Sequence, residues 1–350
     1  MLQRSTDNGK PCRVQGFLLL CGALLLLASC GGAGAESDMV VLNGNAQGST
    51  FTIKYLDSLQ RDLSSPVDSI FRVIDQSLSL WDSTSTVSAF NATSDTFITD
   101  DVHFRVVLFL AESYWRSTDR AFDPTVLPLV RAWGFGRNGI TDMDTSKVLS
   151  MLSYIGMNGI RVTAMSLTKP GASVIYYKRS PKVQFDPNGI AQGYTVDVIA
   201  LYLQQQGIAN YMVEVGGEAR CNGVNDAGKP WQIQIDKPEV EHVQQTVVPL
   251  QDKSLATSGN YRKFIEIGGK RYGHTIDPRT GRPAMNALLS ASVIADDCVT
   301  ADALGTALMV MGPEEGKTWL AQHREVEAYL IIDDGASGYV IWNTPGWPTK

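Results

Sequence analysis

Residues 299–312 read VTADALGTALMVMG, and this stretch is the one from which the fold is best read. It is apolar and rich in helix-forming residues, which predicts a buried helix. Asp302 and Thr306 are four residues apart, so both side chains lie on one face of that helix. Two explanations are open. Thr300 could cap the helix, with Asp302 favouring the dipole and the Thr306 hydroxyl bonding back to the carbonyl of residue 302. Alternatively, the two side chains are hard oxygen ligands of a divalent metal.

Around this helix the chain alternates short strands and helices. The pattern predicts strands at 39–57 (two, around a glycine turn), 174–179, 182–186, 211–217, 231–236, 254–260, 263–274, 287–296, 328–333 and 339–343. It predicts helices at 64–82 (with Ser65 as cap and Pro66 in its first position), 100–118, 144–154 (stopped by Gly156), 190–206 and 313–323. Prolines and glycines in 121–136 predict irregular structure there. The sequence therefore indicates one α+β domain over 38–350, as one body or two lobes, with a mixed, mainly antiparallel sheet and packed helices.

The charge balance makes the chain acidic. Lys and Arg total 30 and Asp and Glu total 36, which gives a net charge of −6. Nucleic-acid binding depends on clustered Lys and Arg, so the sequence argues against a nucleic-acid partner.

The N-terminus has the features of an export signal. Basic residues precede the apolar run FLLLCGALLLL (17–27), which is shorter than the about 20 residues that span a bilayer. The run ends in LASC (27–30), which resembles the lipobox of bacterial lipoproteins. We expect a signal peptide over 1–29, a lipidated Cys30 and a flexible tether through residue 37, with the protein anchored in the bacterial cell envelope and facing the periplasm or the exterior. In the alternative, the signal is an ordinary one and Cys30 is incidental. Cys221 and Cys298 remain in the domain and could form a disulfide.

Three further stretches carry polar residues that local structure does not require. In FDPNGIAQGYTVD (185–197) a strand gives way to a helix, whose N-terminus could bind phosphate or could simply be capped by Asp186 or Asn188. In VEVGGEARCNG (213–223) the paired glycines suit either a close approach to a ligand or a hairpin turn. HTIDPRTGRP (274–283) offers His274 for phosphate contact or proton transfer, although a structural histidine and a turn-forming Asp277 are equally open.

Taken in order, seven stretches resemble the FAD:protein FMN transferase family, the ApbE-like flavin transferases. The resemblance runs from about Asn43 to Gly312 and rests on NAQGSTFTIKY, AFDPTVLPLVRAWGFG, DPNGIAQGYTVD, VEVGGEARCNG, ATSGNYRKF, GHTIDPRTGRPA and TADALGTALMVMG. It implies an ApbE-like, T-fold-like architecture. It also implies Mg²⁺-dependent transfer of FMN from FAD to a Ser or Thr hydroxyl of a target protein, with release of AMP.

The resemblance further implies roles for individual residues. A metal would bind Asp302, Thr306 and the backbone carbonyl of Gly189. His274 would contact the transferred phosphate and, with Asp302, form the catalytic pair. Contacts to the flavin and its phosphates would come from Gln47, Ala121, Phe122, Asp123, Asp186, Gln192 and Ile276. Gln192 stands where many members have Lys, and Gln47 where Met is usual.

Two rival functions are compatible with the same residues. Water could replace the acceptor hydroxyl, which would make the protein an FAD pyrophosphatase that releases FMN and AMP. The chain could instead be a non-catalytic flavin-binding lipoprotein, although binding alone scarcely needs Mg²⁺. For the transferase, the resemblance suggests a subunit of a membrane redox complex as the acceptor protein.

Overall fold

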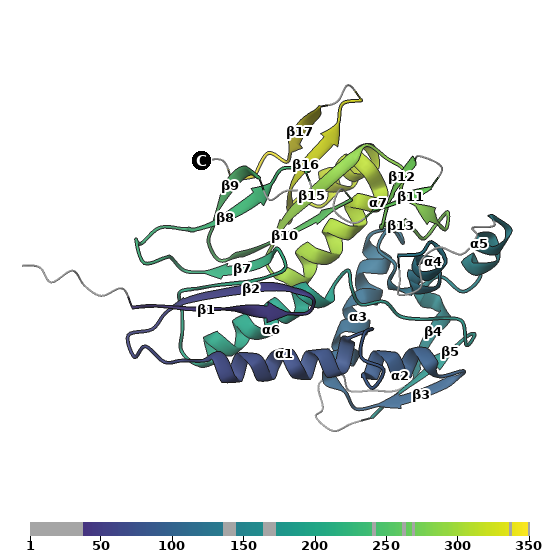
Figure 1. Cartoon of the computed structure of the whole chain (residues 1–350), viewed down its shortest axis with the longest axis horizontal. Helices are drawn as coiled ribbons and strands as arrows, with labels where there is room; N and C mark the ends of the chain where they lie inside the picture. The colour runs from purple at the N-terminus through teal and green to yellow at the C-terminus, as the bar shows by residue number, and fades with distance from the viewer. Residues whose placement is uncertain are drawn as a thin grey trace, which may run out of the picture. The chain divides into compact units, whose positions relative to one another are not determined.

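The computed structural model describes residues 38–135, 145–163, 173–239, 243–260, 264–267, 270–335 and 338–348. Asp38–Lys350 forms one compact unit, and it is built on an eight-stranded sheet (Figure 1). The strand order is β1 (Met39–Ala46), β2 (Ser49–Leu56), β6 (Tyr211–Val215), β7 (Glu218–Asn222), β10 (Lys253–Gly259), β15 (Leu288–Ala295), β16 (Glu327–Asp333) and β17 (Tyr339–Asn343). Every neighbouring pair in it is antiparallel, which confirms the predicted α+β class with a mainly antiparallel sheet.

Smaller sheets surround the main one. A three-stranded sheet has the order β3 (Thr96–Thr99), β5 (Val174–Lys178) and β4 (Ile160–Thr163). Three hairpins are β8 (Trp231–Asp236) with β9 (Gln244–Leu250), β11 (Phe264–Ile267) with β12 (Lys270–Gly273), and β13 (Ile276–Asp277) with β14 (Arg282–Pro283). In Figure 1 the three-stranded sheet lies beside α2, apart from the main sheet.

The helices in the described part of the chain are α1 (Ser64–Leu78), α2 (Thr86–Ala92), α3 (Val102–Ser117), α4 (Leu127–Ala132), α5 (Thr145–Leu152), α6 (Ala191–Gln205) and α7 (Cys298–Gln322), with 3₁₀ turns η1 (Pro124–Val126) and η2 (Met157–Gly159). Helix α7 packs along β10 and β15, and α6 packs along β6 and β7, so the two cover one face of the main sheet. The apolar core on this face includes Ala291, Val293, Leu304 and Leu308. On the other face, Trp231 and Ile233 of β8 pack against Ile294.

Helix α7 consists of two segments joined at a kink. Gly312 has φ 74° and ψ −179°, outside the helical region, and Pro313 comes directly after it. At the kink, the Asn286 side-chain amide donates to the carbonyl of Met309 at 3.0 Å and so satisfies a helix-end acceptor. The predicted helices at 299–312 and 313–323 are therefore both present, one on each side of this break.

Several local predictions are wrong. The strand expected at 263–274 is instead a hairpin of two strands, β11 and β12. Residues 182–186 form no strand, because Asn91 takes up the backbone groups of Phe185: its Nδ2 donates to that carbonyl at 2.9 Å and its Oδ1 accepts from that N–H at 2.7 Å. Within 121–136 the chain forms η1 and α4, because Pro124 and Pro128 occupy early helical positions where a missing N–H costs little. Ser65 does not cap α1, and the helix ends at Leu78 rather than residue 82.

Residues 1–37 lie outside the described residues, so the signal peptide, the lipidation of Cys30 and the tether remain predictions. Among the described helices none combines the length and apolarity needed to cross a membrane. Cys221 and Cys298 are buried free thiols in separate apolar clusters: Cys221 packs with Trp231, and Cys298 packs with Val196. The structure therefore contains no disulfide between these two residues.

Candidate active site

Helices α6 and α7 meet in a regular antiparallel contact, here called the α6–α7 ladder. The contact consists of three residue pairs, here called rungs. Successive rungs are four residues apart, or about one helical turn, in both segments. The pairs are Gly189 with Thr306, Gly193 with Asp302, and Asp197 with Cys298. The first two pairs contain all three residues predicted to bind a metal.

Asp302 is a buried carboxylate without a cationic partner among the groups that set its pKa. Its side chain is 5% exposed, and its Oδ2 accepts a hydrogen bond of 3.0 Å from the Gly193 N–H. No described residue donates to the other oxygen, Oδ1. Burial raises the pKa of Asp302 to about 7; the Gly193 N–H lowers it, and the charge of Asp197 raises it. Among the described residues the carboxylate therefore has one oxygen without a donor, and a cation beside it would stabilise its charged form.

Thr306 also keeps an available oxygen. Within the described part of the chain its hydroxyl makes no hydrogen bond, so the expected back-bond to the carbonyl of residue 302 is absent. A Cβ placed on Gly189 would lie 3.2 Å from Thr306 Oγ1, which shows how closely the backbone turn before α6 approaches this hydroxyl. Thr300 is not the cap of α7, because Asp297 Oδ1 accepts from the Thr300 N–H at 2.8 Å.

These groups fit a hard divalent cation. The described residues contain no cluster of three or more His, Cys, Asp or Glu side chains suited to a metal. A site on the ladder would instead combine one carboxylate, one hydroxyl and a backbone carbonyl, and would leave positions for water or substrate phosphate. Such sparse oxygen coordination is typical of Mg²⁺ sites that act on phosphates.

Gln192 and Gln47 border the ladder. The paired glycines Gly216 and Gly217 form the β6–β7 hairpin turn, with φ values of 68° and 108°. A Cβ on Gly216 would lie 2.4 Å from Gln192 Nε2, so this turn also allows the Gln192 amide to approach closely. Gln47, in the β1–β2 turn, donates from Nε2 to Thr195 Oγ1 at 2.9 Å. Gln192 therefore belongs to the first turn of α6, and Gln47 contacts the next turn through Thr195.

The 121–123 loop is divided between the ladder and a cavity behind it. Phe122 faces the ladder, because a Cβ on Gly189 would lie 3.3 Å from its ring. The Asp123 side chain turns away: its Oδ2 accepts from Trp115 Nε1 at 2.9 Å, and its Oδ1 accepts from the Thr125 N–H at 2.8 Å. It lines a cavity of about 290 Å³ together with Trp115, Arg120, Pro278 and Arg279.

The other predicted flavin contacts are Ala121, Asp186 and Ile276. Ala121 is buried in the main core. Asp186 is buried; its N–H donates to the carbonyl of Pro124 at 2.7 Å, and its Oδ1 accepts from the Asn188 N–H at 3.0 Å. Asp186 therefore joins the turn before α6 to the 121–126 segment. Ile276 packs with Leu129 and Val148 in a separate small cluster, so its side chain is not part of the ladder.

His274 lies between β12 and β13 and is half-buried. The next residue, Thr275, donates from Oγ1 to Asn260 Oδ1 at 2.8 Å, so the segment is fastened to the end of β10. On β10, Ser258 Oγ lies 3.0 Å from a Cβ placed on Gly305, the neighbour of Thr306. The same end of β10 thus contacts both the histidine segment and the turn of α7 that carries Thr306. The role of His274 itself stays a prediction.

For Asp277, in the HTIDP segment, the structure supports the turn-forming role. Asp277 forms the turn, accepting from the Arg279 N–H at 2.8 Å and pairing with the Arg279 guanidinium at 3.0 Å. Tyr261 and Arg262, which belong to the ATSGNYRKF stretch, lie outside the described residues.

Interpreting the sequence residue by residue did not identify a role for Asp197, Arg220 or Asn91 in positioning the site. Asp197 could have been found, because residues 189, 193 and 197 repeat at helical spacing and so do residues 298, 302 and 306. Nothing in the pattern of the VEVGGEARCNG stretch distinguishes Arg220 from its neighbours. Asn91 is not distinguished either, since its contact with Phe185 joins segments 94 residues apart.

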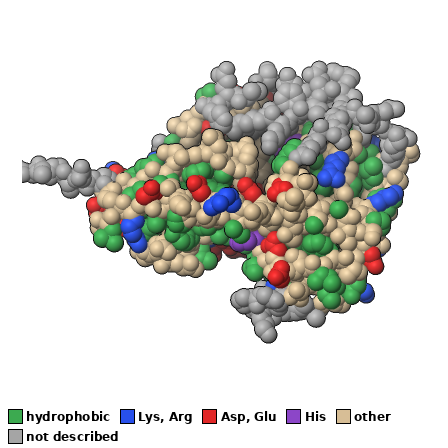
Figure 2. All heavy atoms as spheres, turned by 60° about the horizontal axis from the view of Figure 1, so that its bottom comes forward, with side chains coloured by type: hydrophobic (Ala, Val, Ile, Leu, Met, Phe, Trp, Pro, Cys, Tyr) green, Lys and Arg blue, Asp and Glu red, His purple; other side chains and the backbone are tan. Residues whose placement is uncertain are grey.

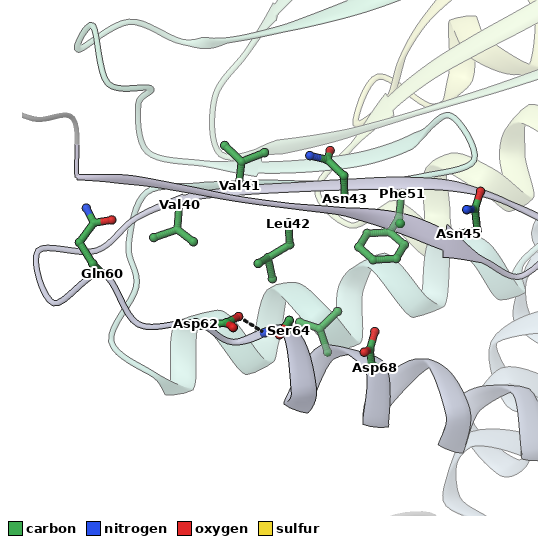
Figure 3. Close-up of a pocket in the computed structure, with 12 residues that line it drawn as sticks. Val40, Val41, Leu42, Asn43, Asn45, Phe51, Gln60, Asp62, Ser64 and Asp68 are labelled. Atoms are coloured by element: carbon green, nitrogen blue, oxygen red, sulfur yellow. Dashed lines mark hydrogen bonds between the residues drawn. The ribbon is translucent and has the colours of Figure 1, made fainter.

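A second cavity lies away from the ladder. It has a volume of about 540 Å³ and lies between the edge strand β1 and the start of α1, where Leu42 and Phe51 face Asp68 (Figure 3). None of the predicted site residues lines it. On the face shown in Figure 2, the visible Lys and Arg side chains lie among Asp and Glu side chains and do not gather into a basic patch. This agrees with the acidic composition.

The buried Asp123 gives a prediction about stability. Burial raises the pKa of Asp123 from its ordinary 3.8 to about 6. The folded state therefore holds this proton at pH values where the unfolded chain has lost it, and stability falls as the pH rises through about 6. Relative to Asp123→Asn, we expect the wild-type free energy of unfolding to fall by about 1.4 kcal/mol between about pH 5 and about pH 7.5. Urea unfolding at the two pH values measures this difference.

The control for that experiment is Asp119→Asn. Asp119 is exposed and has φ 46°, a conformation that asparagine tolerates, so its variant should follow the wild-type pH profile. Parallel profiles for wild type and Asp123→Asn would contradict the prediction.

Comparison with known proteins agrees with this geometry. The sequence model of the ApbE family matches residues 47–330. The chain is similar to an FAD:protein FMN transferase of Vibrio cholerae (37% identity, covering 93% of this chain and 97% of that protein) and to one of Haemophilus influenzae (34%, 91% and 92%). Among solved structures it is similar to the flavin transferase ApbE from Vibrio cholerae (TM-score 0.76, 34% identity, covering 89% of this chain and 98% of that one) and to the apo form of the Pseudomonas stutzeri flavinyl transferase ApbE (TM-score 0.78, 30%, 88% and 95%). The chain belongs to the ApbE family.

Proposed function

We infer that this protein is an FAD:protein FMN transferase, an enzyme that moves FMN from FAD to an acceptor protein. The observation that carries this inference is the ladder itself: Asp302 Oδ1 and Thr306 Oγ1 are both left without hydrogen bonds from described residues, beside the Gly189 turn. Relatives named for this activity match almost the whole chain and support the same conclusion.

We further propose that the reaction depends on Mg²⁺ held by Asp302, Thr306 and the Gly189 carbonyl. When bound there, Mg²⁺ would neutralise the FAD pyrophosphate and withdraw electron density from its phosphorus atoms. The uncompensated carboxylate of Asp302 supports this assignment, because a buried charge is tolerated when a counter-ion meets it.

The proposed reaction is a phosphoryl transfer to a Ser or Thr hydroxyl. The acceptor oxygen forms a bond to the phosphorus of the FMN half of FAD, and the bond from that phosphorus to the bridging oxygen breaks. AMP leaves with the bonding electrons, and the hydroxyl proton passes to a base. His274, directly after the end of β12, is the proposed phosphate contact; either it or a carboxylate receives the proton.

The chain's own groups would fix the substrate rather than react with it. Phe122 packs closely against the backbone of Gly189, which has no side chain. Gln192 and Gln47 offer uncharged amides beside the N-terminal turns of α6, whose positive dipole end favours phosphate. We also propose that the protein works at a bacterial membrane, tethered through Cys30, on a subunit of a membrane redox complex.

An acceptor-dependent mass shift tests the function. Protein, FAD and Mg²⁺ are incubated with and without a candidate acceptor subunit, and all species are examined by intact-mass spectrometry. A transferase adds the mass of FMN to the acceptor. Free FMN and AMP at the same rate without acceptor would identify an FAD pyrophosphatase, which uses the same residues, and intact FAD under both conditions would identify a binding protein.

Thr306 provides a prediction with a matched pair of variants. Thr306→Val keeps the shape but removes the oxygen, so we expect the Mg²⁺ concentration for half-maximal transfer to rise about tenfold or more. Thr306→Ser keeps the oxygen and should stay within about threefold of wild type. Neither variant loses a hydrogen bond within the described structure, so both should unfold near the wild-type temperature. Equal Mg²⁺ requirements in Thr306→Val and wild type would exclude Thr306 as a ligand.

A further inference from the structure

The third rung of the α6–α7 ladder has no part in the proposed transfer reaction. We propose that Asp197 is a positioning residue, which holds α7 in the register that places Asp302 for metal binding. The proposal rests on the proposed function, because it takes Asp302, Thr306 and Gly189 as the metal site.

Asp197 fastens the first turn of α7 to α6. Its Oδ1 accepts from the Cys298 N–H at 3.0 Å, and its Oδ2 accepts from the Val299 N–H at 2.8 Å. Helix N-termini are usually capped by a residue of their own chain segment, as Asp297 does here for Thr300. Here the neighbouring helix supplies the acceptor for the two preceding N–H groups, so α7 cannot slide along α6 without losing both bonds.

Arg220 ties the same carboxylate to the sheet. Its Nη1 lies 2.5 Å from Asp197 Oδ1, and the two side chains are only 27% and 15% exposed. Asp197 therefore joins α6, α7 and β7 at a single point. The guanidinium also compensates the Asp197 charge, so this carboxylate is held as a structural anchor rather than left free for a cation.

The anchor matters because the metal ligands lie on the two rungs beside it. A displacement of α7 by one residue would turn its side chains by about 100° and carry Asp302 and Thr306 away from Gly189. The hydrogen bond from the Gly193 N–H is made by the proposed metal-binding side chain itself. It therefore does not fix the position of α7 independently of that side chain. Groups that orient metal ligands in this way typically change metal affinity by about 10–100-fold when removed.

The test measures metal binding without turnover. Mn²⁺, which takes the same kind of oxygen ligands as Mg²⁺, is titrated into FAD-free full-length protein and followed by electron paramagnetic resonance. We expect Asp197→Ala to raise the Mn²⁺ dissociation constant about tenfold or more. Asp197→Asn keeps one oxygen acceptor but turns an NH2 group toward the other α7 N–H, so it should also raise the dissociation constant, by about threefold or more. The control is Asp296→Asn, which removes an 85% exposed carboxylate from the same helix end and should bind like wild type.

Each outcome decides between these possibilities. Asp197→Ala with wild-type affinity overturns the proposal, and so does Asp197→Asn with wild-type affinity, because α7 would then not depend on both carboxylate oxygens. Asp302→Ala separates the two levels of inference. If it leaves Mn²⁺ binding unchanged, the proposed metal site is wrong. If it abolishes binding while Asp197→Ala does not weaken it, only the positioning role fails.

A second variant covers the case in which Asp197→Ala does not fold. Arg220→Gln leaves both α7 N–H groups capped but releases the carboxylate from β7. It should raise the dissociation constant about threefold or more, and an unchanged constant would overturn the proposal. Circular dichroism at the assay temperature verifies that each variant is folded.

Discussion

Replacing Asp302 with asparagine will lower FMN transfer about a thousandfold or more while leaving the protein folded. Asparagine matches aspartate in size and can still accept from the Gly193 N–H, which lies 3.0 Å from Asp302 Oδ2. It lacks the charge that a cation requires. The loss therefore reports the missing metal rather than a rearranged helix. Transfer rates at saturating FAD and Mg²⁺, followed by acceptor mass, measure the effect.

The same substitution should make the metal-free protein more stable. In wild type no cation among the described residues pairs with this buried carboxylate, and its ionised form therefore costs free energy that a neutral amide does not. We expect the free energy of unfolding without metal to rise by about 1–2 kcal/mol in Asp302→Asn. Asp296→Asn, at an exposed carboxylate six positions earlier, should change neither quantity. Near-wild-type transfer by Asp302→Asn would remove the basis of the proposed function.

Gly193→Ala is expected to have the second large effect. An alanine Cβ would lie 2.5 Å from the carbonyl oxygen of Cys298 and 2.8 Å from the Cβ of Asp302. Neither atom belongs to a flexible side-chain end, so α6 and α7 must separate. We expect the free energy of unfolding to fall by about 3 kcal/mol or more, and transfer to fall with it as Asp302 moves. Chemical unfolding and the mass assay measure the two changes.

The sign of this effect is what makes it informative. Alanine normally stabilises a helix by about 1 kcal/mol relative to glycine, so a large loss can come only from the helix contact. Gly316→Ala in the second segment of α7 is the matched control, because its Cβ would meet only a Leu308 methyl carbon, at 3.1 Å, which can yield. A Gly193→Ala protein as stable as wild type would show that the two helices are not held this closely.

Patterns within one element were sufficient to predict most of the fold. Alternation gave the β1–β2 hairpin, and apolar spacing gave α3, α6 and the first segment of α7, because these signals depend only on neighbouring residues. Residues 182–186 show the limit. Their composition suits a strand, but Asn91, far away in sequence, takes the backbone hydrogen bonds that a neighbouring strand would need.

The candidate site shows the same division. Spacing placed Asp302 and Thr306 on one face of a helix, and the turn at Gly189 before another, but could not show that these two faces meet. That pairing depends on a glycine at 193, whose missing side chain admits α7, and on the long-range Asp197 contact. The resemblance places Asp123 and Ile276 with the flavin, and this stays a prediction; in the structure their side chains contact Trp115 and Leu129, partners that the local sequence does not indicate.

The kink at Gly312 has a consequence for how much change the protein can absorb. The segment before it is fixed at both ends, by Asp197 and Asp297 at its start and by Asn286 at its finish. The segment that begins at Pro313 is a separate piece of helix, joined through a single non-helical residue. Insertions and deletions in that second piece can therefore accumulate during evolution, or be engineered as attachment points, without turning the segment that carries Asp302 and Thr306 by even one residue.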